Sequence, residues 1–229
     1  MTLSPFEQFL SALPSHVVLE ALADKSSIMP LNLSLTNTAL QTVDLSSSKA
    51  LEVYIWNEMA RQQAKVAVGG YLEHRGLYRR STYFKPLNDA TERNIHLGLD
   101  VWAAVDTPVL APLKGSIHSF NNNTNHGDYG PTLILKHKIE GFEFYTLYGH
   151  LSLASMSSWR VGEVVNQGQQ IGSLGAAEVN GDYPPHLHFQ IIRAIQDFKG
   201  DYPGVSNLKD IAFYKENCPD PNLLLGLTM

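Results

Sequence analysis

The chain has 229 residues, of which 44% are hydrophobic and 17% are charged. This composition supports a substantial buried core, in one domain or two small ones, and argues against a disordered chain. The formal net charge is −5 and no stretch is rich in Lys and Arg, so nucleic-acid binding is disfavoured.

The N-terminal part, residues 1–66, is predicted to be an accessory segment that is helical with an extended stretch. Apolar residues at helical spacing predict a short helix that ends before Pro14. An extended stretch is expected over residues 29–45, and the serines at 46–48 offer N-caps for a helix through about Lys65. We expect the segment to pack on the rest of the chain, because its apolar stripes need a surface to cover.

An aromatic and basic stretch follows at Tyr71–Arg80. Its tyrosines and arginines could line the approach to an active site and bind a carboxylate or a phosphate. The same residues could equally form a strand with a solvated face.

From Leu99 onward the pattern predicts strands separated by turn clusters. We therefore expect a mainly β domain over residues 67–200 (α+β overall), an antiparallel sheet or sandwich with a groove. The groove walls are predicted at 121–129 and 175–185, with 121–125 as a polar loop, and residues 201–229 as an irregular tail packed on the domain. The expected strands are Pro131–Ile139, Phe142–Tyr148, Val161–Val165 and Phe189–Ile195.

Features of the whole chain bear on its location. Cys218 is the only cysteine, which excludes an intrachain disulfide and a cysteine-based metal site. No segment approaches the ~18 uninterrupted apolar residues of a membrane helix. The first residues lack the basic start and apolar run of a signal peptide, so we expect a cytoplasmic protein, or an exported one if the N-terminus was trimmed.

Four histidines and an aspartate lie in three separated segments, His96–Asp100, Tyr148–His150 and His186–His188. Strand-forming residues flank the last pair, so His186 and His188 are predicted on one face of a strand, about 7 Å apart. A fully extended run would hold His96 and Asp100 about 13 Å apart, too far for one metal ion. We therefore expect a bend or bulge at Gly98.

These residue types indicate a zinc site. Histidine is the commonest metal ligand, and two histidines with one carboxylate leave a coordination position open, as catalytic zinc requires. Two histidines would then remain outside the metal shell. His126 and Asp128 are interpreted as loop surface rather than as ligands.

Several motifs, in matching order and spacing over about residues 93–195, together resemble a lysostaphin-type, or LytM-like, zinc metallopeptidase domain. The resemblance implies that His96, Asp100 and His188 bind zinc, and that His150 and His186 are catalytic histidines that do not bind it. The motifs are His96–Asp100, Thr107–Pro112 with Gly115, Tyr129–Gly130, Tyr148–Ser152, Gly168–Gly172 and Pro185–Phe189.

The chemistry of such a site requires a proton acceptor beside the metal. The helical His-Glu-x-x-His motif, whose Glu is the general base, is absent from the sequence. A histidine outside the metal shell can replace it. His186 is the preferred base, and His150 would orient water or stabilise the oxyanion; the sequence does not separate the two roles.

We therefore expect a zinc-dependent endopeptidase that cuts peptide bonds in peptidoglycan or in other peptides of small residues. One alternative is a LytM-like binding or activator module without catalysis. Another is a cytoplasmic zinc amidase that acts on a small substrate.

Overall fold

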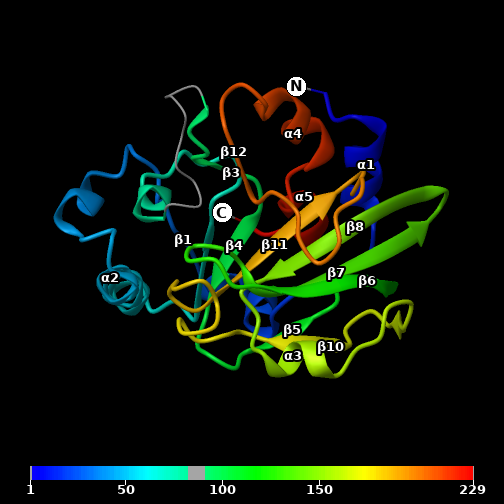
Figure 1. Ribbon diagram of the computed structural model, residues 1–229, viewed down its shortest axis with the longest axis horizontal. Helices are drawn as coiled ribbons and strands as arrows, with labels where there is room; N and C mark the ends of the chain where they lie inside the picture. The colour runs from blue at the N-terminus through cyan, green and yellow to red at the C-terminus, as the bar shows by residue number, and fades with distance from the viewer. Residues whose placement is uncertain (1, 82–90, 229) are drawn as a thin grey trace.

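The computed structural model describes residues 2–81 and 91–228 and is organised around one eight-stranded mixed sheet (Figure 1). Neighbouring strands are antiparallel except for the first pair, β1 and β2, which is parallel. This confirms the mainly β fold with an antiparallel sheet. In spatial order the strands are β1 (Ile28–Pro30), β2 (Val66–Gly69), β4 (Leu99–Trp102), β11 (His186–Ile192), β8 (Phe142–Gly149), β7 (Gly130–Ile139), β6 (Gly115–Asn123) and β9 (Val164–Val165).

Smaller elements surround this sheet. Two short strand pairs join β5 (Pro108–Leu110) to β10 (Gln170–Ser173) and β3 (Ile95–His96) to β12 (Val205–Ser206). The α-helices are α1 (Pro5–Ala12), α2 (Ser48–Arg61), α3 (Ala154–Ser157), α4 (Ile211–Asn217) and α5 (Asn222–Leu225). The 3-10 helices are η1 (Glu20–Ala23), η2 (Lys25–Ser27), η3 (Thr38–Thr42) and η4 (Leu77–Arg80).

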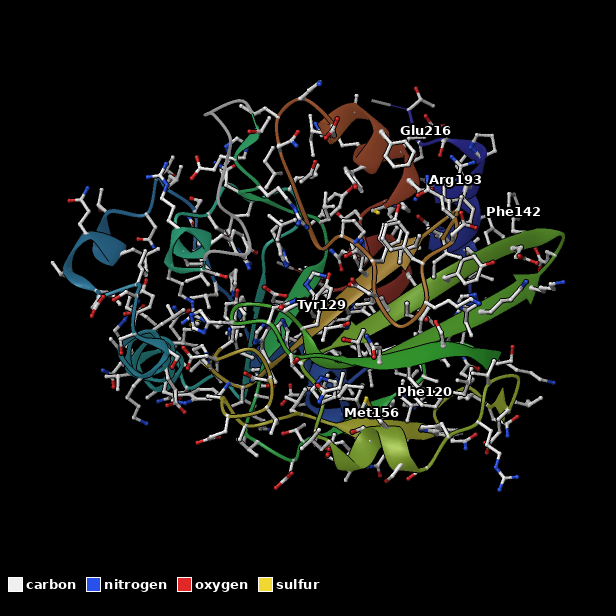
Figure 2. All side chains as sticks on the ribbon, in the orientation of Figure 1. Phe120, Tyr129, Phe142, Met156, Arg193 and Glu216 are labelled. Carbon is white, nitrogen blue, oxygen red and sulfur yellow. The ribbon has the colours of Figure 1, made fainter. Side chains whose placement is uncertain are left out.

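Helix α1 ends before Pro14, as the sequence predicts. The Ser4 hydroxyl and the Glu7 carboxylate form a capping box at its start. Its apolar face packs against β8, where the Phe9 and Phe142 rings stack with centroids 4.3 Å apart, and Figure 2 shows Phe142 beside the helix. Leu10 on the same face is completely buried. The N-terminal helix is therefore part of the main core.

The second N-terminal helix, α2, packs on the face of the sheet opposite to the face that α1 covers. Its stripe of Leu51, Ile55 and Met59 is buried in a cluster that includes Trp102 of β4. Strand β1 pairs with β2 and extends the sheet beyond β4. The division of the chain at residue 66 stays a prediction, and the sheet continues across that point.

Two predictions about irregular regions were wrong. Asn121–Asn123 belongs to β6 instead of a loop, because its backbone pairs with β7 and the Asn123 amide donates to Thr132 Oγ1 and the Gly200 carbonyl. The segment 201–229 is not uniformly irregular, since it contains α4 and α5. Its expected packing is confirmed by Leu224, which is buried in the main core.

The two faces of the central strands have different surroundings. In β11, Leu187, Phe189 and Ile191 project into the main core, while His186 and His188 alternate with them and project to the opposite face. The predicted placement of the two histidines on one strand face is confirmed. Within the described residues, no helix has the length and apolar character needed to cross a bilayer.

The burial of α1 predicts a measurable contribution to stability. Leu10→Ala should lower the free energy of unfolding by about 2–5 kcal/mol, because the lost side chain leaves a cavity in the core. Urea denaturation followed by circular dichroism would measure it. Leu3→Ala, at a residue with 41% exposure, is the control; equal effects from the two variants would show that α1 does not belong to the core.

Candidate metal centre

The register of three central strands brings the first site residues together. On β11, His188 lies opposite Asp100 of β4 on one side and opposite Gly149 of β8 on the other. Directly opposite residues of an antiparallel pair project to the same face. His188 and Asp100 therefore face the same space, with His186 two residues away.

A bend brings His96 to the same place. The chain leaves β3 at His96, turns at Leu97–Gly98 and enters β4 at Leu99. A Cβ at Gly98 would lie 2.5 Å from the imidazole of His188, so only glycine fits under that ring. The predicted bend is confirmed, and it places His96 Nε2 3.2 Å from Asp100 Oδ1.

Three ligand-type atoms meet at this point. His188 Nδ1 lies 2.8 Å from His96 Nε2 and 3.2 Å from Asp100 Oδ1. All three side chains are at most 3% exposed. Ligands of a tetrahedral zinc ion, bound at about 2.0–2.1 Å, lie about 3.3 Å from each other. The three atoms form a possible His-Asp-His metal site.

In the His96 and His188 rings, the nitrogen that points away from the cluster determines whether the nitrogen that points into it carries a proton. His96 Nδ1 donates to the Gly70 carbonyl at 2.9 Å, and His188 Nε2 donates to Gln190 Oε1 at 2.8 Å. A neutral imidazole carries only one proton, so both inner nitrogens present lone pairs. Asp100 Oδ1, which they face, has no hydrogen-bond partner among the described residues. Three acceptors in mutual contact repel one another unless a cation lies between them, and this fits a metal ion.

The other two histidines, His186 and His150, border the cluster. In each of them one ring nitrogen also donates its proton to a carbonyl oxygen. His186 Nδ1 donates to the Pro184 carbonyl at 2.8 Å, and His150 Nδ1 donates to the Asn180 carbonyl at 2.7 Å. Their rings lie with centroids 4.2 Å apart, and His186 Nε2 is 3.9 Å from Asp100 Oδ1. The structure thus brings all five predicted site residues together.

The backbone at His150 is strained. Its φ of 62° is left-handed, which is uncommon for a residue other than glycine. Hydrogen bonds from its N–H to the Tyr129 carbonyl and from Gly175 N–H to its own carbonyl hold this conformation. Such outliers cluster at functional sites, where the surrounding structure determines them.

Burial sets the charge of these groups. It lowers the pKa of His96 to about 3, with help from the positive charge of Arg75. It also lowers the pKa of His186 and holds that of His150 well below its ordinary value, so both rings stay neutral. Burial acts to raise the pKa of Asp100, but the ion pair with the Arg75 guanidinium holds that pKa well below its ordinary value, and Asp100 remains a carboxylate.

The Tyr71–Arg80 stretch has a role that the sequence did not resolve. It forms a turn followed by η4 and contains no strand. Its three arginines pair with carboxylates of the same chain: Arg75 with Asp100, Arg79 with Glu92 and Arg80 with Asp182. Arg75 thus contacts the metal site itself, and the proposed binding of an external carboxylate is not needed to explain these side chains.

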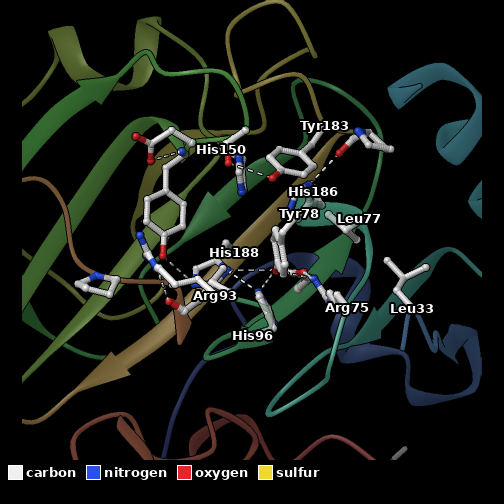
Figure 3. A pocket seen from close by; sticks show the side chains of 18 of the residues that line it. Leu33, Arg75, Leu77, Tyr78, Arg93, His96, His150, Tyr183, His186 and His188 are labelled. Atoms are coloured by element: carbon white, nitrogen blue, oxygen red, sulfur yellow. Dashed lines mark hydrogen bonds and ion pairs between the residues drawn. The ribbon is translucent and has the colours of Figure 1, made fainter. Parts of the chain in front are cut away.

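A cleft of ≈ 240 Å³ opens over the histidines (Figure 3). Gly127–Tyr129 and Tyr183–Pro184 line it, so parts of the two predicted groove walls are confirmed. Leu33 and Leu51 of the N-terminal segment also line it. Asp128 is buried and faces the cleft, contrary to the prediction of loop surface, because its carboxylate accepts from the Tyr129 N–H.

Comparison with known proteins finds similarities over this part of the chain. Residues 94–200 match the model of Peptidase family M23. The chain is 30% identical over 115 residues to an uncharacterized metalloprotease of Haemophilus influenzae, a match over 49% of this chain and 22% of that protein. It is 34% identical over 98 residues to the peptidoglycan DD-endopeptidase ShyC of Vibrio cholerae, over 42% of this chain and 20% of that protein. The chain therefore spans only about a fifth of each relative.

Two solved structures are also similar to part of this chain. The catalytic domain of lysostaphin from Staphylococcus simulans is 24% identical, with a TM-score of 0.37, over 58% of this chain and 88% of that one. A zinc-containing peptidase from Vibrio cholerae is 27% identical, with a TM-score of 0.36, over 52% of this chain and 35% of that one.

The geometry predicts how metal binding depends on the three converging side chains. The wild-type chain should hold one zinc ion, and His188→Ala should remove most of it, because one of three ligand atoms is lost. Metal analysis by mass spectrometry after dialysis would measure this. His126→Ala, at a histidine whose side chain is 53% exposed, is the control and should keep the metal. Full zinc occupancy in His188→Ala would contradict the assignment.

Proposed function

We propose that this chain, whose residues 94–200 form a lysostaphin-type, LytM-like metallopeptidase domain of Peptidase family M23, is a zinc-dependent endopeptidase. The observation that carries the proposal is the convergence of three buried acceptor atoms from His96, Asp100 and His188 beside two neutral imidazoles. A purely structural cluster would place donors opposite these acceptors.

Zinc suits this set of donors better than other common metals do. Two imidazole nitrogens and one carboxylate oxygen are a set found in catalytic zinc sites, whereas magnesium and calcium prefer oxygen ligands alone. The absence of cysteine from the cluster separates it from most structural zinc sites, which are closed by thiolates. A zinc ion bound there would supply Lewis acidity to the scissile carbonyl and acidify the attacking water.

His186 is our proposed general base. The Pro184 carbonyl holds the proton of Nδ1, so Nε2 presents its lone pair toward Asp100 Oδ1 at 3.9 Å. The stacked Trp102 ring, 5.6 Å away between centroids, fixes the plane of the imidazole. His186 can therefore accept the proton of the attacking water at Nε2 and later deliver it to the leaving amine.

His150 is suited to orient that water. Its Nδ1 proton is donated to the Asn180 carbonyl, and burial keeps the ring neutral, so Nε2 can accept a hydrogen bond but not donate one. An acceptor in this position directs a water molecule. Stabilising an oxyanion would require a proton on the same atom, so of the two roles expected for His150, we favour the first.

We propose a peptide substrate of the peptidoglycan type, or another peptide of small residues. The support is the similarity to a relative named as a peptidoglycan endopeptidase and the cleft that opens over the histidines. Incubation with purified peptidoglycan and, separately, with oligoglycine and oligoalanine peptides would test it. New amino groups released from at least one substrate are expected, and release from none would favour the binding-module alternative.

The location in the cell stays a prediction. A cytoplasmic protein would favour the small-amide alternative, since intact wall lies outside the membrane. Fractionation of the native host with an antibody against the chain would decide it, and recovery from the periplasm or the medium would contradict the cytoplasmic prediction.

The division of labour among the five residues gives a test of mechanism. His186→Ala and His150→Ala should each lower kcat by about 10²- to 10⁴-fold, the range for a lost acid–base group, while zinc content stays at the wild-type level. Peptidase assay paired with metal analysis would measure both quantities. His118→Ala, on β6 outside the cleft, is the matched control. Loss of zinc from either variant would show that its histidine is a ligand.

A further inference from the structure

The two oxygens of Asp100 have different surroundings. Oδ1 faces the lone pairs of His96 and His188, at 3.2 Å from each. Oδ2 accepts a hydrogen bond of 2.6 Å from Nη1 of Arg75. Both side chains of this ion pair are at most 3% exposed. One carboxylate oxygen is thus engaged by the protein, and the other is left for the metal site.

Arg75 is itself held by a second carboxylate. Its Nε donates to Glu73 Oε2 at 2.7 Å, and Glu73 Oε1 accepts from the backbone N–H of Leu33 at 2.9 Å. A continuous series of hydrogen bonds therefore runs from Leu33 in the N-terminal segment through Glu73 and Arg75 to Asp100. Figure 3 shows Leu33 and Arg75 on the same side of the cleft as His96.

The backbone joins this series to the other ligands. The turn at residues 70–75 bonds to the strand that carries His96, through Leu72 N–H to the His96 carbonyl and His96 N–H to the Glu73 carbonyl. Gly70 accepts from the His96 ring, and a Cβ at Gly70 would overlap Nη2 of Arg75. Movement of Arg75 would consequently displace His96 as well.

We propose that Glu73 and Arg75 are positioning residues of the metal centre, a charge-neutral pair of a buried arginine and a largely buried glutamate that fixes Asp100 as a ligand through one oxygen. This inference rests on the proposed zinc site. The planar guanidinium bonds two carboxylates at fixed angles, which sets the plane of the Asp100 carboxylate. A lone guanidinium beside a metal ion would repel it, and the negative charge of Glu73 cancels that repulsion.

The first test is Arg75→Lys, which keeps the charge but replaces the fork with a single ammonium. We expect zinc to bind about 10- to 100-fold more weakly, the range for loss of an outer-shell partner. Competition with a chromophoric chelator, on full-length protein shown to be folded by circular dichroism, would measure the Kd. Arg79→Lys is the matched control, since the Arg79 side chain pairs with Glu92 and is 68% exposed.

A second readout separates positioning from general support. With cobalt in place of zinc, the intensity of the visible absorption bands reports coordination number. Arg75→Lys should weaken these bands, because a released carboxylate can bind through both oxygens and raise that number. A structural role alone would lower the melting temperature and leave the spectrum as in wild type.

Glu73→Gln removes the negative charge of Glu73 together with one of its two acceptor oxygens. It leaves one carbonyl oxygen to accept from Arg75 but removes the neutralising charge, so zinc should again bind more weakly. If the pair acts as a unit, the double variant Glu73→Gln/Arg75→Lys should lose less affinity than the two single variants predict together.

The outcomes are distinguishable. Wild-type zinc affinity and an unchanged cobalt spectrum in folded Arg75→Lys would overturn the role of the pair while leaving the metal site intact. If Arg75→Lys does not fold, Glu73→Gln decides the question, and wild-type affinity there would overturn the proposal. Failure of the wild-type chain to bind zinc or cobalt would overturn the proposed function instead.

Discussion

The structure depends on one unfavourable contact, the meeting of three buried acceptor atoms from His96, Asp100 and His188 within 2.8–3.2 Å. Each could escape by a ring flip or a carboxylate rotation. Neither happens, because the outer atom of each group is already bonded, to Gly70, Gln190 or Arg75. The fold thus stabilises an arrangement that is costly without a cation, which is how a protein prepares a metal site in advance. A bound cation removes the repulsion and, by linkage, stabilises the native state.

Much of the geometry of this site can be predicted from the sequence with local rules. Strand periodicity places His186 and His188 on one face, and the pairing of β4 with β11 only has to supply Asp100 opposite. The bend at Gly98 follows from distance, since an extended run would separate His96 and Asp100 too far for one metal ion. Both inferences need only the alternation and rise per residue of a strand and the short distance between side chains that bind one metal ion.

The outer partners do not follow from such rules. Gln190 supports His188 because its amide is oriented by the Pro203 carbonyl and Cys218, which approach from elsewhere in the chain. Arg75 is close to Asp100 only because the turn before β3 bonds back onto that strand. Before folding, Arg75, Arg79 and Arg80 look alike. Burial separates Arg75, at 3% exposure, from Arg79, at 68%, whereas Arg80 is as buried as Arg75, at 4%, but pairs with Asp182 instead of Asp100. Burial and partner are both properties of the tertiary structure.

Residues 2–81 precede the match to Peptidase family M23, which begins at residue 94, and this longer segment belongs to the argument. Without β2, the polar edge of β4, the strand that carries Asp100, would be open to solvent or to another chain. The segment also supplies Leu33, whose N–H orients Glu73, and Leu51, which lines the cleft. The five site residues lie within 94–200, the range that matches the family model, whereas the groups that hold Asp100 in place come from residues before it. The proposed metal centre therefore draws on both parts of the chain, and the placement of Asp100 depends on residues that precede the matched region.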